Sequence, residues 1–126
     1  MSKLQDFLNS NRIDQIEKEI IVSKRIKDDN GEYLKFRIRP ITEDELKQAR
    51  KGCNNDQDRM AKRIAIAGTI DPNFNCAESI KCMGCRTAEE YITKILLVGE
   101  IAKLALEIGE VSGFNEFDGM IEEAKN

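Results

Sequence analysis

The chain has 126 residues, which is enough for one hydrophobic core but too few for two independent ones. Its net charge is −3, and the 20 basic and 23 acidic residues are interleaved along the sequence. Nucleic-acid binders and polybasic membrane tethers need a surplus of Lys and Arg that this chain lacks, so we expect neither kind of partner.

Residue types that commonly carry catalysis are also scarce. The sequence contains no His, which is the commonest general base and metal ligand near neutral pH. No carboxylate or lysine stands in a recognisable catalytic spacing, and the polar start of the chain has no apolar stretch of signal-peptide length. The composition therefore predicts a cytoplasmic protein that binds another protein, needs no cofactor and is not an enzyme.

A short helix is predicted over residues 2–10. Ser2 can cap it, and Leu4, Phe7 and Leu8 recur at helical spacing. The polar segment that follows is expected to link this helix to the next element.

A β-hairpin is predicted over residues 19–39. Two runs of alternating apolar and polar residues flank a turn at residues 28–31, which contains Asn30 and Gly31. Asn and Gly tolerate the positive φ that such turns require, and Pro40 ends the second strand. Because a lone hairpin is marginal in water, its even-numbered apolar face is expected to bury against a core. That face consists of Ile20, Val22, Ile26, Leu34, Phe36 and Ile38.

The odd-numbered positions of the same hairpin carry a row of cations. A solvated strand face, whose charges discourage edge-to-edge aggregation, is the simpler interpretation. Docking of an acidic partner is the alternative. The residues are Arg25, Lys27, Lys35, Arg37 and Arg39.

The rest of the chain, residues 42–124, is predicted to be helical. Thr42 with Glu45, and Thr87 with Glu90, have the spacing of capping boxes that begin helices. The expected helices span about 42–51, 54–70, 87–112 and, in the tail, 114–126, with a turn around 76–81 and an interruption at 99–100. The sequence thus predicts one mainly α domain of the α+β class over residues 1–126, an N-terminal hairpin followed by four or five short helices.

The late helical region has a long apolar stripe. Its simplest interpretation is core, although part of it could also form a groove for a partner helix. The residues of this candidate surface are Ile92, Leu96, Ile101, Leu104 and Ile108.

Four cysteines could form a structural zinc site. Cys82 and Cys85 make a C-x-x-C, and Cys76 and Cys53 lie upstream. A second C-x-x-C, which would make the signal strong, is missing, so reduced and partly buried thiols are the simpler interpretation. A small zinc-binding regulatory or adaptor domain is the alternative function.

Several segments, in their order and spacing, resemble the XkdN-like family of phage tail assembly chaperones. They are residues 4–8, 22–25, 34–39, 41–45, 71–74, 96–101 and 112–115, with a closing run at 121–126. Val98 departs from the pattern, which has Pro before Gly-Glu.

The resemblance implies a role as well as a fold. Such a chaperone binds the long, helical tape measure protein, keeps it soluble and brings it to the growing tail tube. The implied partners are the tape measure protein and the major tail tube protein, in the host cytoplasm and not in the mature virion.

Overall fold

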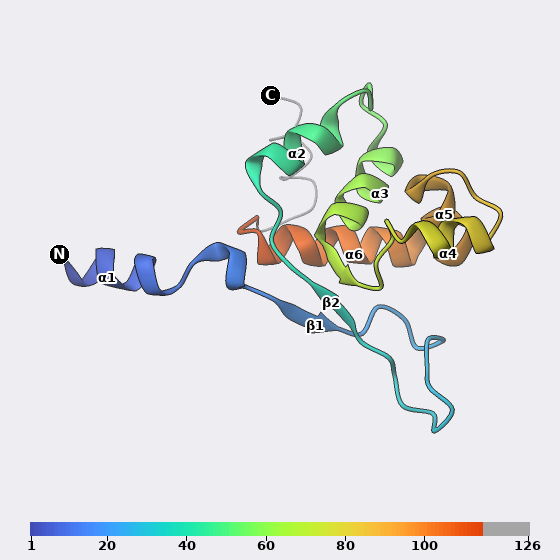
Figure 1. Ribbon diagram of the computed structural model, residues 1–126, viewed down its shortest axis with the longest axis horizontal. Helices are drawn as coiled ribbons and strands as arrows, with labels where there is room; N and C mark the ends of the chain where they lie inside the picture. The colour runs from blue at the N-terminus through green and yellow to red at the C-terminus, as the bar shows by residue number, and fades with distance from the viewer. Residues whose placement is uncertain (115–126) are drawn as a thin grey trace.

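The computed structural model of the protein describes residues 1–114. Figure 1 shows the later helices gathered on one side of a small sheet, while α1 extends away from them. The fold is α+β and mainly helical, as predicted, and five helices follow the hairpin in the described residues. The elements are α1 (Lys3–Ser10), the 3-10 helix η1 (Ile13–Gln15), β1 (Lys18–Ile20), β2 (Phe36–Ile38), α2 (Glu43–Arg50), α3 (Gln57–Gly68), β3 (Thr69–Asp71), α4 (Ala77–Cys82), α5 (Ala88–Ile95) and α6 (Val98–Val111).

The predicted hairpin is present, but its ladder is short. β1 and β2 pair antiparallel with Ile20 opposite Phe36, and only an isolated bridge between Lys27 and Tyr33 continues the pairing toward the tip. The tip is held by Asp28, whose Oδ1 accepts hydrogen bonds from two backbone N–H groups of the turn. Four of the six apolar side chains of the even face are buried and Ile26 is half-buried.

Leu34 does not follow the expected pattern. Its side chain is 48% exposed, because the ladder ends before it reaches this part of the hairpin. The alternation of apolar and polar residues predicts which face of a strand is apolar. It does not predict how much of that apolar face the helices cover.

A third strand, β3, was not predicted. The helix expected over residues 54–70 begins at Gln57 and ends at Gly68, and the next three residues pair antiparallel with β2. The N–H of Arg39 donates to the carbonyl of Gly68 at 2.9 Å, which joins this helix end to the sheet. The pairing covers an edge of β2 that would otherwise present unpaired backbone groups.

The remaining helices match the prediction with local corrections. The expected turn around residues 76–81 is the short helix α4, and the interruption near residue 99 is the start of α6 at Val98. Val98 is thus the first residue of a helix. Pro is also common at this position, so a pattern with Pro here and a chain with Val begin the helix at the same residue. The predicted tail helix lies, beyond Phe114, outside the described residues.

Of the two predicted capping boxes, one is complete and the other is half formed. Thr42 and Glu45 form a full capping box at α2. At α5, the Thr87 hydroxyl accepts from Glu90 as predicted, but the Glu90 carboxylate accepts from the N–H of Arg86 instead of that of Thr87. The prediction of a reciprocal box at α5 was therefore only half right.

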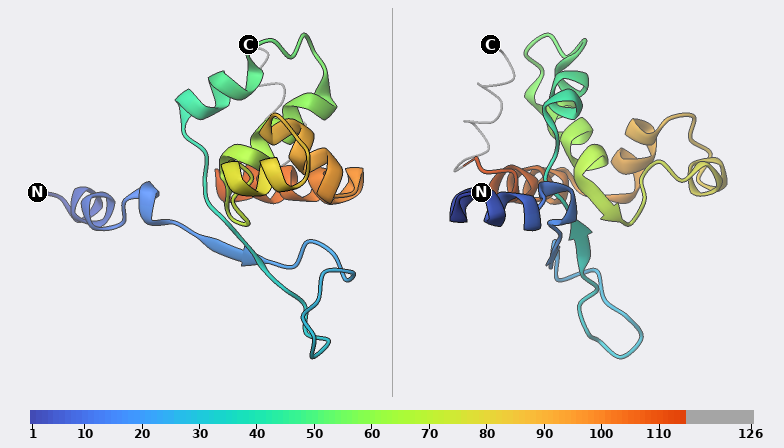
Figure 2. Two further views of the ribbon diagram at one scale, coloured as in Figure 1. Left: turned by 45° about the vertical axis from the view of Figure 1, so that its right-hand side comes forward. Right: turned by 60° about the vertical axis from the view of Figure 1, so that its left-hand side comes forward.

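The centre of the core is the contact between α3 and α6. Both helices present fully buried side chains to it, Ile64 from α3 and Leu104 and Ile108 from α6. At the end of α3, a Cβ added to Gly68 would lie 2.6 Å from Cγ2 of Ile108, so only glycine permits this approach. Figure 2 shows the ribbons of α3 and α6 crossing in both views.

A buried carboxylate of α6 fastens the hairpin to the helices through an ion pair. Arg25 donates from Nε and Nη2 to the two carboxylate oxygens of Glu100, at 2.8 and 2.6 Å, and also to the carbonyl of Ile95 at 3.1 Å. Glu100 is only 5% exposed and additionally accepts from the N–H of Leu97. These hydrogen bonds, the one from Arg25 first, lower the pKa of Glu100 to about 2.

The first prediction concerns the contact at Gly68. Gly68→Ala should lower the free energy of unfolding by about 1–3 kcal/mol, because the new methyl overlaps a buried, β-branched side chain that has no room to move. Gly99→Ala is the matched control, since nothing lies within 4 Å of a Cβ there. Urea unfolding followed by circular dichroism measures both, and equal stabilities of the two variants would contradict the packing argument.

The second prediction concerns Glu100. Glu100→Gln should lower the free energy of unfolding by about 1–3 kcal/mol at neutral pH, because it removes a charged acceptor from Arg25. The folded-state pKa of about 2 lies below the ordinary value of 4.5, so this stabilisation is complete above about pH 4.5 and is lost as the pH falls toward 2.

The stability difference between wild type and Glu100→Gln should accordingly narrow as the pH falls below about 4.5. Glu107→Gln is the control on the same helix, because Glu107 makes a single contact of 3.2 Å with the half-exposed Lys18. A pH-independent difference for Glu100→Gln would show that the ion pair does not carry the effect.

Candidate functional site

The apolar residues predicted to meet a partner lie in the core. Ile92 is on α5, Leu96 joins α5 to α6, and the other three, Ile101, Leu104 and Ile108, are on α6. All five are at most 8% exposed. In this conformation they support the fold, and contact with a partner through them would require the helices to separate.

The five cations on the odd-numbered face of the hairpin have different surroundings. Arg25 is bound to Glu100, and Arg39 makes a bidentate pair with Glu45 at 2.5 and 2.8 Å and donates to the carbonyl of Ala67. The Arg39 guanidinium lowers the pKa of the Glu45 carboxyl. These two arginines fasten the hairpin to α6 and to α2.

The other three cations are at the surface. Arg37 lies 3.3 Å from a carboxylate oxygen of Glu17, and both side chains are about half exposed. Lys27 and Lys35 are exposed. Lys27, Lys35 and Arg37 are therefore the members of this face that a partner can reach.

Three exposed apolar residues belong to the two segments that the Arg25–Glu100 ion pair joins, and we call them the corner surface. It consists of Leu34 on the hairpin and Leu97 and Val98 at the start of α6, of which the last two are 60% and 76% exposed. The N–H of Leu34 bonds to the carbonyl of Ile26, next to Arg25, so the ion pair holds the two segments together. The alternating pattern of the hairpin placed Leu34 on the core-facing side, and nothing in the sequence marked Leu97 or Val98 as surface for a partner.

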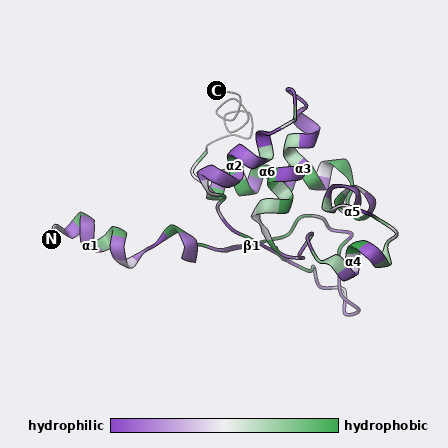
Figure 3. Cartoon of the chain, turned by 45° about the horizontal axis from the view of Figure 1, so that its top comes forward, coloured by the Kyte–Doolittle hydropathy of each residue, from purple (hydrophilic) through white to green (hydrophobic). Residues whose placement is uncertain are grey.

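A second apolar region is the N-terminal arm, residues 1–16. Its helix α1 has the predicted N-cap, with the Ser2 hydroxyl accepting from the N–H of Gln5, and it contains no buried residue. Figure 3 shows both hydrophobic and hydrophilic positions on α1, which stands apart from the helices of the body. Its exposed apolar side chains are Leu4, Phe7 and Leu8, followed on the arm by Ile13 and Ile16.

An open groove lies between α2, α3 and α5, with a volume of about 490 Å³. Apolar side chains from three helices line it, and polar ones, among them Asp44 and Gln48 of α2, stand beside them. The apolar lining residues are Ala49, Ile66, Ala67 and Ala88.

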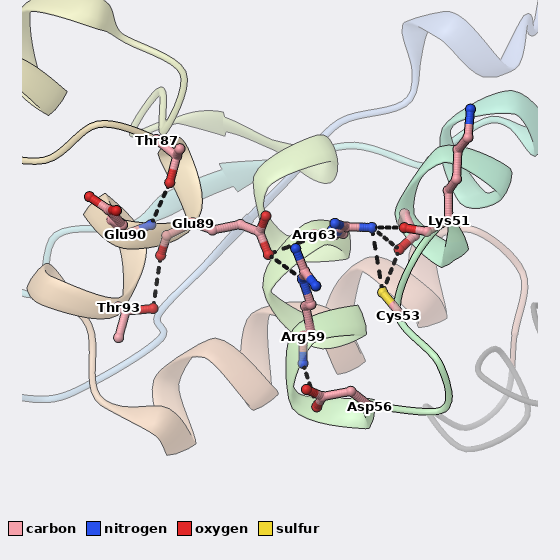
Figure 4. A network of polar contacts seen from close by, with 10 residues as sticks. Lys51, Cys53, Asp56, Arg59, Arg63, Thr87, Glu89, Glu90 and Thr93 are labelled. Carbon is pink, nitrogen blue, oxygen red and sulfur yellow. Dashed lines mark hydrogen bonds and ion pairs between the residues drawn. The ribbon is translucent and has the colours of Figure 1, made fainter.

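A polar network holds the walls of this groove in place. Figure 4 shows Arg63 of α3 directed toward the C-terminal end of α2, where it donates to the carbonyls of Ala49 and Lys51. Its guanidinium also lies 3.6 Å from the carboxylate of Glu89 on α5, and Arg59 approaches the same oxygen at 3.2 Å. Arg63 therefore links all three helices around the groove.

The four cysteines do not form a common site. Cys53 is buried, and its Sγ donates to the carbonyl of Ala49. Cys76 precedes α4, where hydrogen bonds from Ser79 lower the pKa of its thiol, and Cys82 and Cys85 follow at the other end of that helix. Within residues 1–114, no three His, Cys, Asp or Glu side chains are grouped so that they could hold a metal ion. The zinc hypothesis therefore gains no support from the arrangement of the thiols.

None of the helices in the described residues is both long and apolar enough to cross a bilayer.

Comparison with known proteins gives a consistent result over nearly the whole chain. The family model of the phage XkdN-like tail assembly chaperone protein matches residues 4–125. The phage-like element PBSX protein XkdN of Bacillus subtilis is 30% identical over 98% of this chain and 93% of its own length. The uncharacterized protein YqbN of the same organism is 29% identical over the same shares.

The structural comparison agrees with the sequence comparisons. The crystal structure of the protein YqbN superposes with a TM-score of 0.73 at 28% identity, covering 91% of this chain and 99% of that one. Matches of this extent place the small sheet, the helices and their order in one common architecture. The chain therefore belongs to the XkdN-like family of phage tail assembly chaperones, as the resemblance of its sequence segments predicted.

Proposed function

We propose that the protein binds the tape measure protein of its phage, keeps it soluble in the host cytoplasm and brings it to the growing tail tube. Membership of a family of tail assembly chaperones supports this proposal, since that role is non-enzymatic and implies phage tail proteins as partners. The major tail tube protein would meet the complex when the tape measure protein is delivered. The chaperone would then leave and stay out of the mature virion.

The observation that carries the proposal is the corner surface. A chaperone needs apolar surface that is exposed while its own core stays closed, because the client's apolar segments are covered by the same hydrophobic effect that drives folding. Leu34, Leu97 and Val98 meet this condition, being exposed beside a buried and well-hydrogen-bonded Glu100. A client helix could pack across them without disturbing the core.

The charged hairpin residues would act at the edge of the same contact. Lys35 follows Leu34 directly and is exposed. Successive side chains of an extended chain leave on opposite faces, so Lys35 would reach carboxylates at the edge of the client's apolar stripe by its long, flexible side chain. Arg37 could do the same if its exposed pair with Glu17 opens, since such pairs are weak. Arg25 and Arg39 would contribute indirectly, by holding the hairpin where it is. The buried stripe from Ile92 to Ile108 would support the surface from below.

The third prediction tests the corner surface directly. Co-expression of the tape measure protein with the double variant Leu97→Ser/Val98→Gln should leave about tenfold less client in the soluble fraction than co-expression with wild type, because two apolar contacts are lost. The variant itself should remain folded, since Leu97 is the N-cap residue of α6 and Ser is favoured there.

Leu106→Gln is the matched control, because Leu106 is also an exposed apolar residue of α6 but lies outside the corner surface. A client that is equally soluble with no chaperone at all would refute the proposed function. A client that needs the chaperone but stays soluble with the double variant would refute the corner surface alone.

A further inference from the structure

The N-terminal arm has the properties of a segment that docks on another surface. An isolated helix of eight residues is not stable in water, because nucleation costs more than so few hydrogen bonds return. In α1, Leu4, Phe7 and Leu8 form one apolar face, and Phe7 is 61% exposed. Lys3 borders that face one turn before Phe7. The helix therefore needs an apolar surface with an acidic group beside it.

The groove between α2, α3 and α5 offers such a surface. Three of its apolar lining residues, Ile66, Ala67 and Ala88, are partly exposed, and Asp44 and Glu89 stand among its lining residues. Glu89 is engaged by Arg59 and Arg63, whereas none of the ion pairs in the described residues involves Asp44. Asp44 can thus pair with a cation that arrives together with an apolar helix face.

We propose that the arm of one copy of this chain docks in the groove of a second copy, with Leu4, Phe7 and Leu8 on the apolar lining and Lys3 beside Asp44.

The arm does not dock in the groove of its own chain. Its root is tied to the sheet and to α6 by the contacts Arg37–Glu17 and Lys18–Glu107, and Figures 1 and 2 show α1 leading away from α2 and α3.

Two arms that paired directly with each other would bury the same apolar face at a higher entropic cost. The groove surrounds the helix with side chains from three elements whose positions Arg63 already fixes. Binding to such a preformed site costs less conformational entropy than ordering two flexible partners.

Sedimentation velocity of the whole chain over roughly 1–200 µM measures the association. We expect wild type to associate as its concentration rises, and Phe7→Glu to raise the apparent dissociation constant by about tenfold or more, because a charge cannot be buried on the apolar lining. Asn9→Glu adds the same charge to the opposite side of α1 and should behave as wild type. Wild type that stays monomeric throughout, or association that Phe7→Glu leaves unchanged, would overturn the proposal.

Mixing of variants distinguishes an arm in a groove from any symmetric contact. Ala88→Glu fills the groove with a charged side chain at the first position of α5, where a carboxylate suits the helix dipole. Ala77→Glu is its control, the same change at the first position of α4 outside the groove. Gln48→Arg, at the groove but in the last turn of α2, replaces Ala88→Glu if that variant fails to fold.

The expected outcome of the mixing is specific. Phe7→Glu alone and Ala88→Glu alone should stay monomeric, whereas their equimolar mixture should form dimers, because the first has an intact groove and the second an intact arm. A mixture that remains monomeric while wild type associates would overturn the docking in the groove.

Discussion

The fold depends on the close approach of α3 and α6 at Gly68 and Ile108. This contact allows α3 to end directly above the sheet, so that the next three residues form β3 and pair with β2. On the other side of the contact, α6 carries Glu100, which binds Arg25 and holds the hairpin. A single glycine thus lets one helix pair support the hairpin at two places, through the backbone of β3 and through an ion pair.

This construction keeps the core closed while leaving apolar surface exposed. Within residues 1–114 the sheet has three short strands, and it would be marginal without the helices that cover one of its faces. Because the ladder is so short, the hairpin extends beyond the core, and Leu34 is exposed in a segment that Arg25 joins to the start of α6 through Glu100. The corner surface is therefore a consequence of where the packed part of the molecule ends, and client binding there would leave the core intact.

Much of the fold was predictable because its signals are local. Ser2 and Thr42 cap helices through hydrogen bonds to residues three positions later, and the turn at Asp28 closes within five residues. β3 was not predictable in this way, because Thr69 to Asp71 form a strand only where β2 offers an edge. The local sequence there continues a helical apolar pattern, and tertiary pairing overrides it.

The candidate surfaces were harder to predict than the fold, for a related reason. The pattern from Ile92 to Ile108 identifies apolar residues, but it does not tell which of them are exposed, and the five predicted ones are buried in this conformation. The role of a charged residue is equally hard to predict. Arg25 and Lys35 look equivalent in the hairpin sequence, but Arg25 binds a buried carboxylate seventy-five positions away, whereas Lys35 remains exposed at the surface. No periodicity encodes such a pairing.

The two proposed surfaces occupy different parts of the molecule, and this separation has a physical consequence. Client binding would use the corner surface at the start of α6, while association between copies would use the arm and the groove bounded by α2 and α5. Neither contact would block the other, so chaperones bound along one long client could also bind their neighbours. Each weak contact would then raise the effective concentration for the next, and the assembly could still come apart one contact at a time when the client is handed over.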